Sequence, residues 1–166
     1  MANSRRNLTD EVTKQRIDLY RKTMRESGFN DAHVAATVDE TWVWRNIFIA
    51  ETDAEAERIG IPLFEAQGEQ RAKMRTRILA ERGESMTKPG ETGVVANMAR
   101  NVVEHSLICG SPATVAERVA KIDALGVGGV ILQFRVSPSL YELKESNIRL
   151  FMDKVAPECQ KRVAAA

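Results

Sequence analysis

The chain has 166 residues, of which 43% are hydrophobic and only 5% aromatic, enough for one core of mainly aliphatic side chains. Its 24 Lys and Arg residues and 23 Asp and Glu residues leave a formal net charge of +1. This balance disfavours a nucleic-acid-binding protein, which usually has a clear basic excess, and gives no reason to expect attraction to an anionic membrane.

The two cysteines, Cys109 and Cys159, are far apart and lack the spacing of metal ligands, so we expect two reduced thiols and no metal site. The longest apolar runs are far shorter than the roughly 20 residues that a membrane-spanning helix needs. The N-terminal residues lack the apolar core of a signal peptide. These features predict a cytoplasmic protein.

The N-terminal part predicts two helices followed by a strand. The first helix covers about Thr9–Ser27, with Thr9 or Asp10 as its cap, and ends at Gly28. A short second helix follows, to about Asp39. The strand Thr41–Ala50 is rich in β-branched and aromatic residues, and its nearly continuous apolar run is typical of a strand covered on both faces.

A long charged region follows this strand. Thr52 and Glu55 form a capping box that starts a helix directly after the strand, which makes a strand–helix unit. We expect an interruption near Gly60-Ile61-Pro62 and then a charged helix, with a solvated face, that ends at Gly83. The segment Glu84–Val103 has few periodic apolar residues and predicts a long mobile loop, because loops of this length are usually lids or disordered.

The C-terminal part predicts a helix, a strand and a last helix. Ser111 caps the first of these helices, Pro112 occupies its first position and Gly126 closes it. The strand is Val127–Phe134, again with the composition of a strand buried on both faces. The last helix carries an apolar stripe and is expected to stop near Pro157; the stripe consists of Ile148, Phe151, Met152 and Val155.

Alternating strands and helices predict a parallel sheet. Two strands that both need cover on two faces cannot supply that cover to each other, and they leave sheet edges with unpaired backbone groups. The sequence is therefore typical of a slice of a larger α/β fold.

Four segments together resemble the luciferase-like family of flavin-dependent monooxygenases. The segment Ile49–Ala56 (IAETDAEA) resembles a "VAeTdaEA" signature, and Cys109–Arg118 (CGSPATVAER) resembles "GSPetVAerl". Ala124–Ile131 resembles "eaGvdhlll", and Ile148–Pro157 resembles the closing "slrlFaeeVaP". The four segments occur in the same order as in the family, and the first two are separated by a long insertion, as expected of a lid loop. The resemblance covers about residues 10–160.

The resemblance implies the last part of a TIM barrel, which is an eight-stranded fold of about 250 residues. Trp42–Ala50 would be the seventh barrel strand and Val127–Phe134 the eighth, with Glu84–Val103 as the lid inserted between them. We therefore expect residues 1–166 to form a single C-terminal segment of an incomplete barrel.

The family's chemistry implies reduced FMN, supplied by a separate flavin reductase, which reacts with O₂ to oxidise a small organic substrate. The resemblance suggests that Arg100 closes on flavin or substrate; a solvated loop arginine is the alternative. Asn46 and Trp44 stand where alkanesulfonate monooxygenases carry a histidine and an arginine. Their replacement favours a terpene- or hydrocarbon-like substrate over a sulfonate, although Trp44 also suits core packing.

Other candidates follow from position. His105 is a candidate acid or base, with a structural role as the alternative. Gln133 and Arg135 end the last strand and face the barrel mouth, where sites of this fold lie. Gly110 and Ser111 suit a turn and a cap, and the helix that they precede is also able to contact a flavin phosphate.

Two alternatives remain open. Sister families with the same signatures use deazaflavin, so a deazaflavin-dependent oxidoreductase is one of them. The other is a truncated, non-catalytic fragment or a split-barrel subunit that needs an N-terminal barrel half. As protein partner we therefore expect either a second copy of the chain, in a homo-oligomer, or an N-terminal barrel half.

Overall fold

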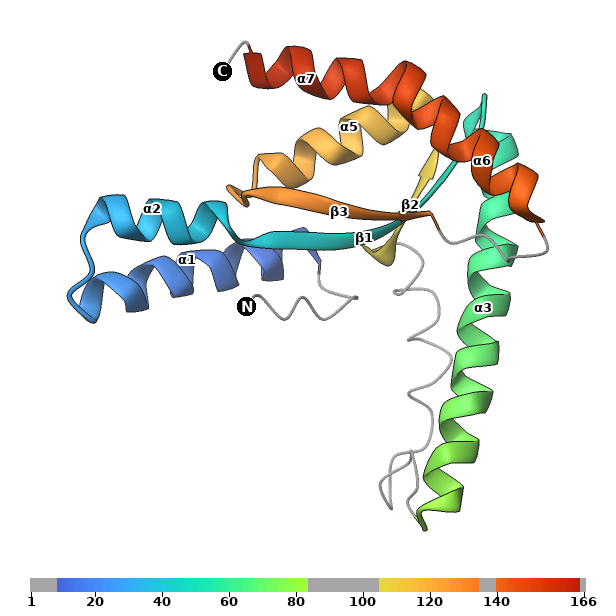
Figure 1. Ribbon diagram of the computed structural model, residues 1–166, viewed down its shortest axis with the longest axis horizontal. Coiled ribbons are helices and arrows are strands. Elements are labelled where there is room, and N and C mark those ends of the chain that lie inside the picture. The colour runs from blue at the N-terminus through green and yellow to red at the C-terminus, as the bar shows by residue number, and fades with distance from the viewer. Residues whose placement is uncertain (1–8, 84–104, 135–139, 165–166) are drawn as a thin grey trace.

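The computed structural model describes residues 9–83, 105–134 and 140–164, with side chains as far as residue 160. The lid predicted at Glu84–Val103 lies outside the described residues. Figure 1 shows the elements, which in chain order are α1 (Asp10–Glu26), α2 (Asp31–Asp39), β1 (Trp42–Ile49), α3 (Asp53–Glu81), β2 (Leu107–Gly110), α5 (Pro112–Asp123), β3 (Gly129–Phe134), α6 (Tyr141–Leu150), the π-helical turn η2 (Phe151–Val155) and α7 (Ala156–Ala164).

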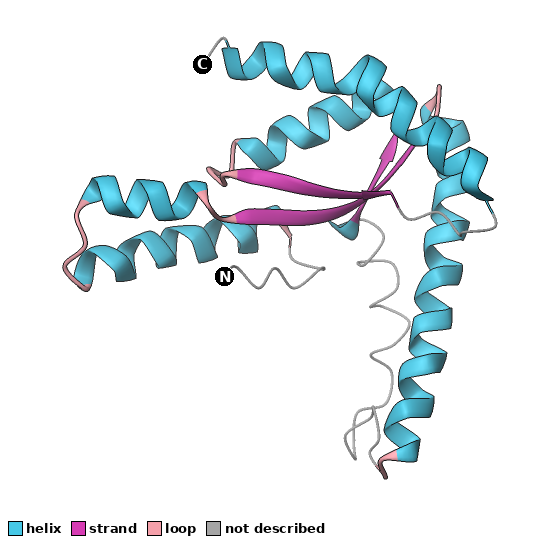
Figure 2. Cartoon of the chain, in the orientation of Figure 1, coloured by secondary structure: helices cyan, strands magenta, loops and turns pink. Residues whose placement is uncertain are grey.

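The strands form one parallel sheet of three strands in the order β2-β1-β3 (Figure 2). The parallel pairing of β1 with β3, predicted from the alternation of strands and helices, is confirmed. The strand β2 was not predicted. It has only four residues and runs directly into the Ser111-Pro112 helix start, so its apolar run is too short to show a strand period.

Local start and stop signals in the sequence produce the predicted helix ends. The hydroxyls of Thr9, Thr52 and Ser111 each accept a hydrogen bond from the backbone N–H three residues later. Three glycines with positive φ follow α1, α3 and α5, namely Gly28, Gly83 and Gly126. These caps fix where each helix begins and ends.

The predicted interruption near Gly60-Ile61-Pro62 is wrong, because α3 runs unbroken from Asp53 to Glu81 with Pro62 inside it. A proline inside a helix costs one hydrogen bond and a clash with the preceding turn. Packing offsets that cost here. Ala56 and Phe64, on either side of Pro62, are both buried against the sheet, so the helix is anchored before and after the proline.

The prediction that the last helix stops near Pro157 is also wrong. Helical structure continues through η2 into α7, which ends at Ala164. A π-helical turn is wider than an α-helical turn and commonly appears as a single bulge within a helix. Because the turn directly before Pro157 is widened, the proline ring has room where an α-helical turn would clash with it.

One face of the sheet is covered by helices and holds the larger core. Alternate residues of β1 and β3 point to this face, and they pack with Ile17 of α1, Val34 of α2, Val115 of α5 and Val155 of η2. The strand residues in this core are Val43, Ile47, Ile49, Val130, Leu132 and Phe134, together with Ile108 of β2.

The opposite face is only partly covered by the described residues. The start of α3 covers Phe48 at the carboxyl end of β1. Towards the amino end, the side chains of Trp42 and Ile131 are 50% and 48% exposed. This side of the sheet is called the open face below, and it carries Trp42, Trp44, Asn46, Ile131 and Gln133. An open three-stranded sheet is what a slice of a larger barrel predicts.

Candidate functional site

Two of the predicted site residues lie side by side in the middle of the open face. Asn46 of β1 is the Cα partner of Gln133 in β3 and of Leu107 in β2, so all three side chains point the same way. Asn46 is 4% exposed, and its Nδ2 donates to the Ser106 carbonyl at 3.1 Å. Within the described residues its Oδ1 accepts no hydrogen bond. The site therefore contains a buried acceptor that suits an N–H or O–H donor.

An apolar surface lies next to this amide. Trp44 is two residues before Asn46 on β1, and it is the Cα partner of Ile131. Trp44 is half-buried, whereas Ile131 is exposed. The open face therefore joins a flat indole ring and an aliphatic side chain to a polar centre, the composition expected of a site for a planar, mostly apolar ligand.

The remaining predicted residues lie elsewhere. His105 is half-buried in a short helical turn at the amino end of β2, two residues before the Leu107 that pairs with Asn46. Gly110 and Ser111 lie at the opposite, carboxyl end of β2. Arg100 and Arg135 lie outside the described residues. The roles proposed for these residues stay predictions.

The N-terminus of α5 already holds a carboxylate of this chain. Asp53 Oδ1 accepts a hydrogen bond from the Ser111 N–H at 2.6 Å. This backbone bond, with smaller contributions from the Thr114 and Ser111 side chains, lowers the pKa of Asp53. A Cβ on Gly110 would lie 2.9 Å from the same Oδ1, so the carboxylate fits the space that the glycine leaves. A phosphate at this helix terminus would have to displace Asp53.

A pocket of about 400 Å³ lies at the carboxyl end of β1, between the start of α3 and α6. Its apolar wall includes Phe48, Ile59 and Leu143, and on its rim Lys154 forms a 2.7 Å ion pair with Glu51. Carboxyl ends of parallel strands are where binding sites of TIM-type folds lie. No sequence pattern predicted this pocket, because its walls come from segments about 100 residues apart in the chain.

Asn147 lines this pocket and fixes its geometry. Its side chain is 2% exposed; Oδ1 accepts from the Ile49 N–H at 2.7 Å, and Nδ2 donates to the Leu143 carbonyl at 3.0 Å. The pairing of β1 with β3 ends at Ile47 and Phe134, and the bond to Gly110 of β2 comes from the Ala50 N–H, so the Ile49 N–H takes its acceptor from Asn147. Asn147 therefore ties the end of β1 to α6. In the sequence, the only sign of this contact is an asparagine next to the apolar stripe of the last helix.

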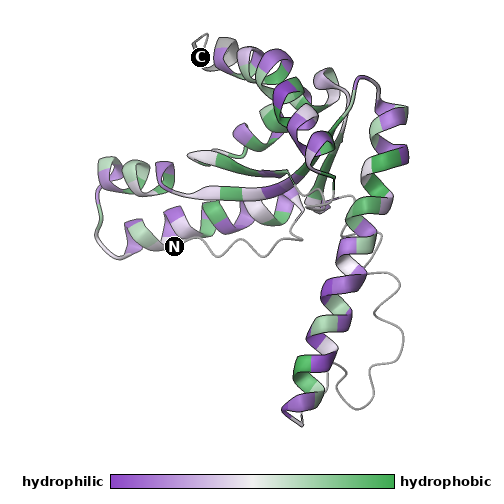
Figure 3. Ribbon diagram, turned by 45° about the vertical axis from the view of Figure 1, so that its right-hand side comes forward, coloured by the Kyte–Doolittle hydropathy of each residue, from purple (hydrophilic) through white to green (hydrophobic). Residues whose placement is uncertain are grey.

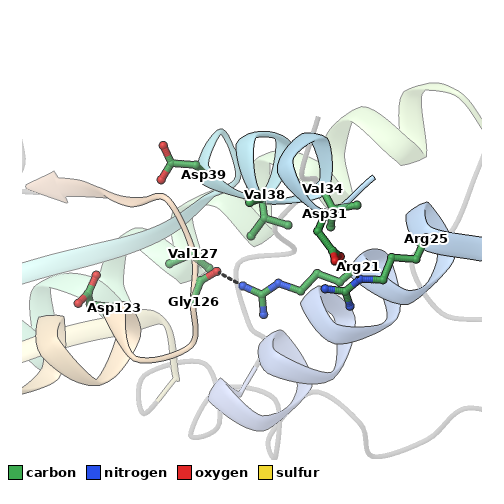
Figure 4. A pocket seen from close by; sticks show the side chains of 10 residues that line it. Arg21, Arg25, Asp31, Val34, Val38, Asp39, Asp123, Gly126 and Val127 are labelled. Atoms are coloured by element: carbon green, nitrogen blue, oxygen red, sulfur yellow. Dashed lines mark hydrogen bonds and ion pairs between the residues drawn. The ribbon is translucent and has the colours of Figure 1, made fainter. Parts of the chain in front are cut away.

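A second pocket, of about 380 Å³, lies at the amino end of the sheet between α1, α2 and the turn before β3 (Figure 4). Its basic groups already have partners. Arg21 donates to the Gly126 carbonyl at 3.0 Å, and Arg25 pairs with Asp31 at 2.7 Å. In TIM-type folds this end contributes to stability, whereas catalysis occurs at the other end. This pocket is therefore a structural junction of the helical pair with the sheet.

Two further side chains, Arg45 and Cys109, also have structural roles; Cys109 lies on the same side of the sheet as Phe48, under the start of α3. Arg45 is 2% exposed on the helix-covered face and pairs with Asp10 at 3.4 Å, so it is paired rather than solvated; burial lowers its pKa despite that pairing. Burial, with smaller contributions from Glu57 and Asp53, raises the pKa of the Cys109 thiol to about 12. This thiol stays protonated and is a poor nucleophile at neutral pH.

In the described ranges, no three His, Cys, Asp or Glu side chains gather closely enough to hold a metal ion. No helix in those ranges has the length and apolar character needed to cross a membrane.

A parallel sheet with helices packed on one face and a polar centre on the other has the architecture of part of a TIM barrel. Solved monooxygenases share this architecture. The chain is similar to the monooxygenase RslO1 from Streptomyces bottropensis (21% identity, TM-score 0.55), covering 93% of this chain and 40% of RslO1. It is similar to the EDTA monooxygenase EmoA from Chelativorans sp. BNC1 (18% identity, TM-score 0.56), again covering 93% and 40%.

A third similar structure is a type II Baeyer–Villiger monooxygenase, the oxygenating constituent of 3,6-diketocamphane monooxygenase from the CAM plasmid of Pseudomonas putida, in complex with FMN. It has 19% identity and a TM-score of 0.50, over 90% of this chain and 40% of that one. No family model and no curated protein matches the sequence. The predicted structural resemblance to luciferase-like flavin monooxygenases is confirmed at the level of the fold, and the chain spans about 40% of their length.

The open face suits the flavin ring of FMN, whereas the N-terminus of α5 does not suit its phosphate. The buried Asn46 Oδ1 matches a ring N–H of a flavin, and Trp44 offers a flat apolar surface beside it. The α5 N-terminus, the place predicted for the phosphate, is occupied by Asp53. The described residues therefore suit the flavin ring and not its phosphate.

Proposed function

We propose that this chain is the C-terminal part of a flavin-dependent monooxygenase that uses reduced FMN and O₂ to oxidise a small organic substrate. The observation that carries the proposal is the buried Oδ1 of Asn46 on the open face, which accepts no hydrogen bond from any residue that the structure describes. Three monooxygenases that share the fold support it, one of them solved in complex with FMN.

Reduced flavin, when bound, supplies the electrons that activate O₂. The residues of this chain hold and orient its ring. Asn46 accepts a hydrogen bond from a ring N–H, Trp44 covers the apolar edge, and Gln133 supplies a second amide next to Asn46. Burial around Asn46 excludes water from this part of the site.

The open face also supports an apolar substrate. Trp42, Trp44 and Ile131 are its large side chains, and none of the three is charged. A terpene- or hydrocarbon-like substrate suits such a surface better than an anionic one. Reduced flavin comes from a separate reductase, and further barrel strands cover the part of the open face that this chain leaves exposed.

Tryptophan fluorescence tests the proposal, since both tryptophans of the chain lie on the open face. In a Trp42→Phe background, Trp44 is the sole reporter. Titration with reduced FMN under anaerobic conditions is expected to quench its emission to saturation. Asn46→Leu removes the acceptor at similar volume and is expected to weaken binding by about tenfold or more.

The matched control is Gln70→Leu, the same loss of an amide at an exposed position of α3, which is expected to leave the affinity unchanged. The proposal fails if reduced FMN does not quench Trp44, or if both variants bind it equally well. Quenching by a reduced deazaflavin alone would also contradict it and would favour a deazaflavin-dependent oxidoreductase.

A further inference from the structure

The distal part of α3 projects away from the rest of the fold (Figure 1). The buried residues of this helix are Ala56, Gly60 and Phe64, so residues 65–81 continue beyond the last of them. That extension is about 25 Å long at 1.5 Å per residue. An isolated helix of this length is only marginally stable in water, which indicates a partner along it. Figure 3 shows this part as mostly hydrophilic, with a hydrophobic group near its end.

Charge is distributed unevenly along α3. Between Asp53 and Glu69 there are five acidic side chains and one arginine, whereas residues 70–81 carry four basic side chains and one glutamate. The helix dipole favours such an order but acts only within the first and last turns. The charges in the middle of the helix therefore need another explanation.

One stripe of α3 is symmetric about Gln70. Its members recur at alternating spacings of four and three residues, which places them on one side of the helix; they are Ile61, Glu65, Gly68, Ala72, Arg75 and Leu79. Each member has a counterpart equally far on the other side of position 70. In an antiparallel pair of α3 helices related by a two-fold axis at that position, Glu65 would face Arg75 of the second copy. Ile61, which packs in part on the core of its own chain, would face Leu79 at the edge of the contact.

The centre of this stripe consists of small residues. Gly68 lies inside the helix, where glycine is less favourable than alanine. A Cβ built on Gly68 meets nothing within 4 Å, so the described part of the chain gives no steric reason for a glycine. Close approach of a second helix at Gly68 and Ala72 gives one, because small side chains let two helix axes come near each other.

We infer that α3 is a self-association surface on which a second copy of this chain packs antiparallel, with the two-fold axis at the level of position 70; the Gln70 side chain itself lies on the opposite side of the helix from the stripe. The acidic half of each helix lies against the basic half of the other, which sets both the direction and the register. This inference does not depend on flavin binding.

Charge reversal tests the pairing. Residues 65 and 75 are ten positions apart, about 15 Å along one helix, so they cannot pair within a chain. Glu65→Arg and Arg75→Glu are each expected to weaken the dimer by about tenfold or more, because two ion pairs become two repulsive contacts. The double variant restores opposite charges and is expected to bring the dissociation constant back to near the wild-type value. The measurement is sedimentation velocity over a range of protein concentrations.

The matched control is Lys73→Glu, which makes the same charge change on another side of the helix and is expected to leave the dimer intact. Circular dichroism checks that each variant keeps its helix content. Gly68→Leu is expected to raise helix content and still weaken the dimer. A chain that is monomeric at all concentrations, or a double variant no tighter than either single one, would overturn the inference. So would association that none of these variants changes, since that would place the contact at the open face.

Discussion

The same substitution at two glycines of α3 is expected to change stability in opposite directions. Gly60 and Gly68 both lie inside the helix, and replacing an interior glycine with alanine favours the helix by about 0.8–1 kcal/mol. A Cβ on Gly60 would lie 2.6 Å from Cγ and Cδ1 of Phe48, whose side chain is 2% exposed. A Cβ on Gly68 meets nothing within 4 Å.

The size of each effect follows from these contacts. Phe48 is held between the sheet and α3, so it cannot move away without disturbing the core. Overpacking of this kind costs about 1–3 kcal/mol, which exceeds the gain in helix propensity. Gly60→Ala is therefore expected to lower the free energy of unfolding by about 1 kcal/mol, and Gly68→Ala to raise it by about 1 kcal/mol.

Urea unfolding followed by circular dichroism, at a concentration where the chain is monomeric, measures both values. The reasoning is refuted if Gly60→Ala stabilises the protein as much as Gly68→Ala does, because α3 would then not pack on Phe48.

Two further predictions concern the carboxyl end of the sheet. Asn147→Ala leaves the Ile49 N–H without its acceptor, so it is expected to lower the free energy of unfolding by about 1–3 kcal/mol and to speed hydrogen exchange at the Ile49 amide. The exposed control Ser146→Ala is expected to change neither quantity. Slow exchange at Ile49 in Asn147→Ala would contradict the role assigned to the Asn147 side chain. The pKa of Asp53 is lowered in the folded chain, so its contribution to stability is present above its ordinary value of 3.8 and is lost as the pH falls through the folded value. Asp53→Asn is accordingly expected to unfold at lower urea concentration than the wild type at pH 7, with the gap closing as the pH falls below 3.8 and the carboxylate becomes protonated. A gap that persists in acid would show that the ionised carboxylate is not the cause.

Features set by neighbouring residues could be predicted from the sequence. The cap at Thr52, the helix end at Gly83 and the apolar run of β1 all depend on contacts within a few positions, and each lies where the sequence predicted it. Strand alternation also predicted that Asn46 lies on the same face as Trp44.

Features set by distant partners could not be predicted. The strand β2 exists because β1 lies beside it, and its four residues carry too little pattern to show this. Pro62 suggests a helix break locally, but packing on both sides of it keeps α3 continuous. The hydrogen bond from Ser111 to Asp53 joins residues 58 positions apart, so no local pattern indicated that a carboxylate fills the α5 terminus.

The central claim is that the sheet is an open slice of a barrel, and solvent paramagnetic relaxation in NMR tests it most directly. A soluble gadolinium chelate relaxes the nuclei that solvent reaches. An open slice is expected to show strong relaxation of the Trp42 indole and the Ile131 methyl groups, and weak relaxation of Ile47 and Ile108 on the helix-covered face. Equal protection of all four side chains would contradict the account, because the sheet would then be covered on both faces.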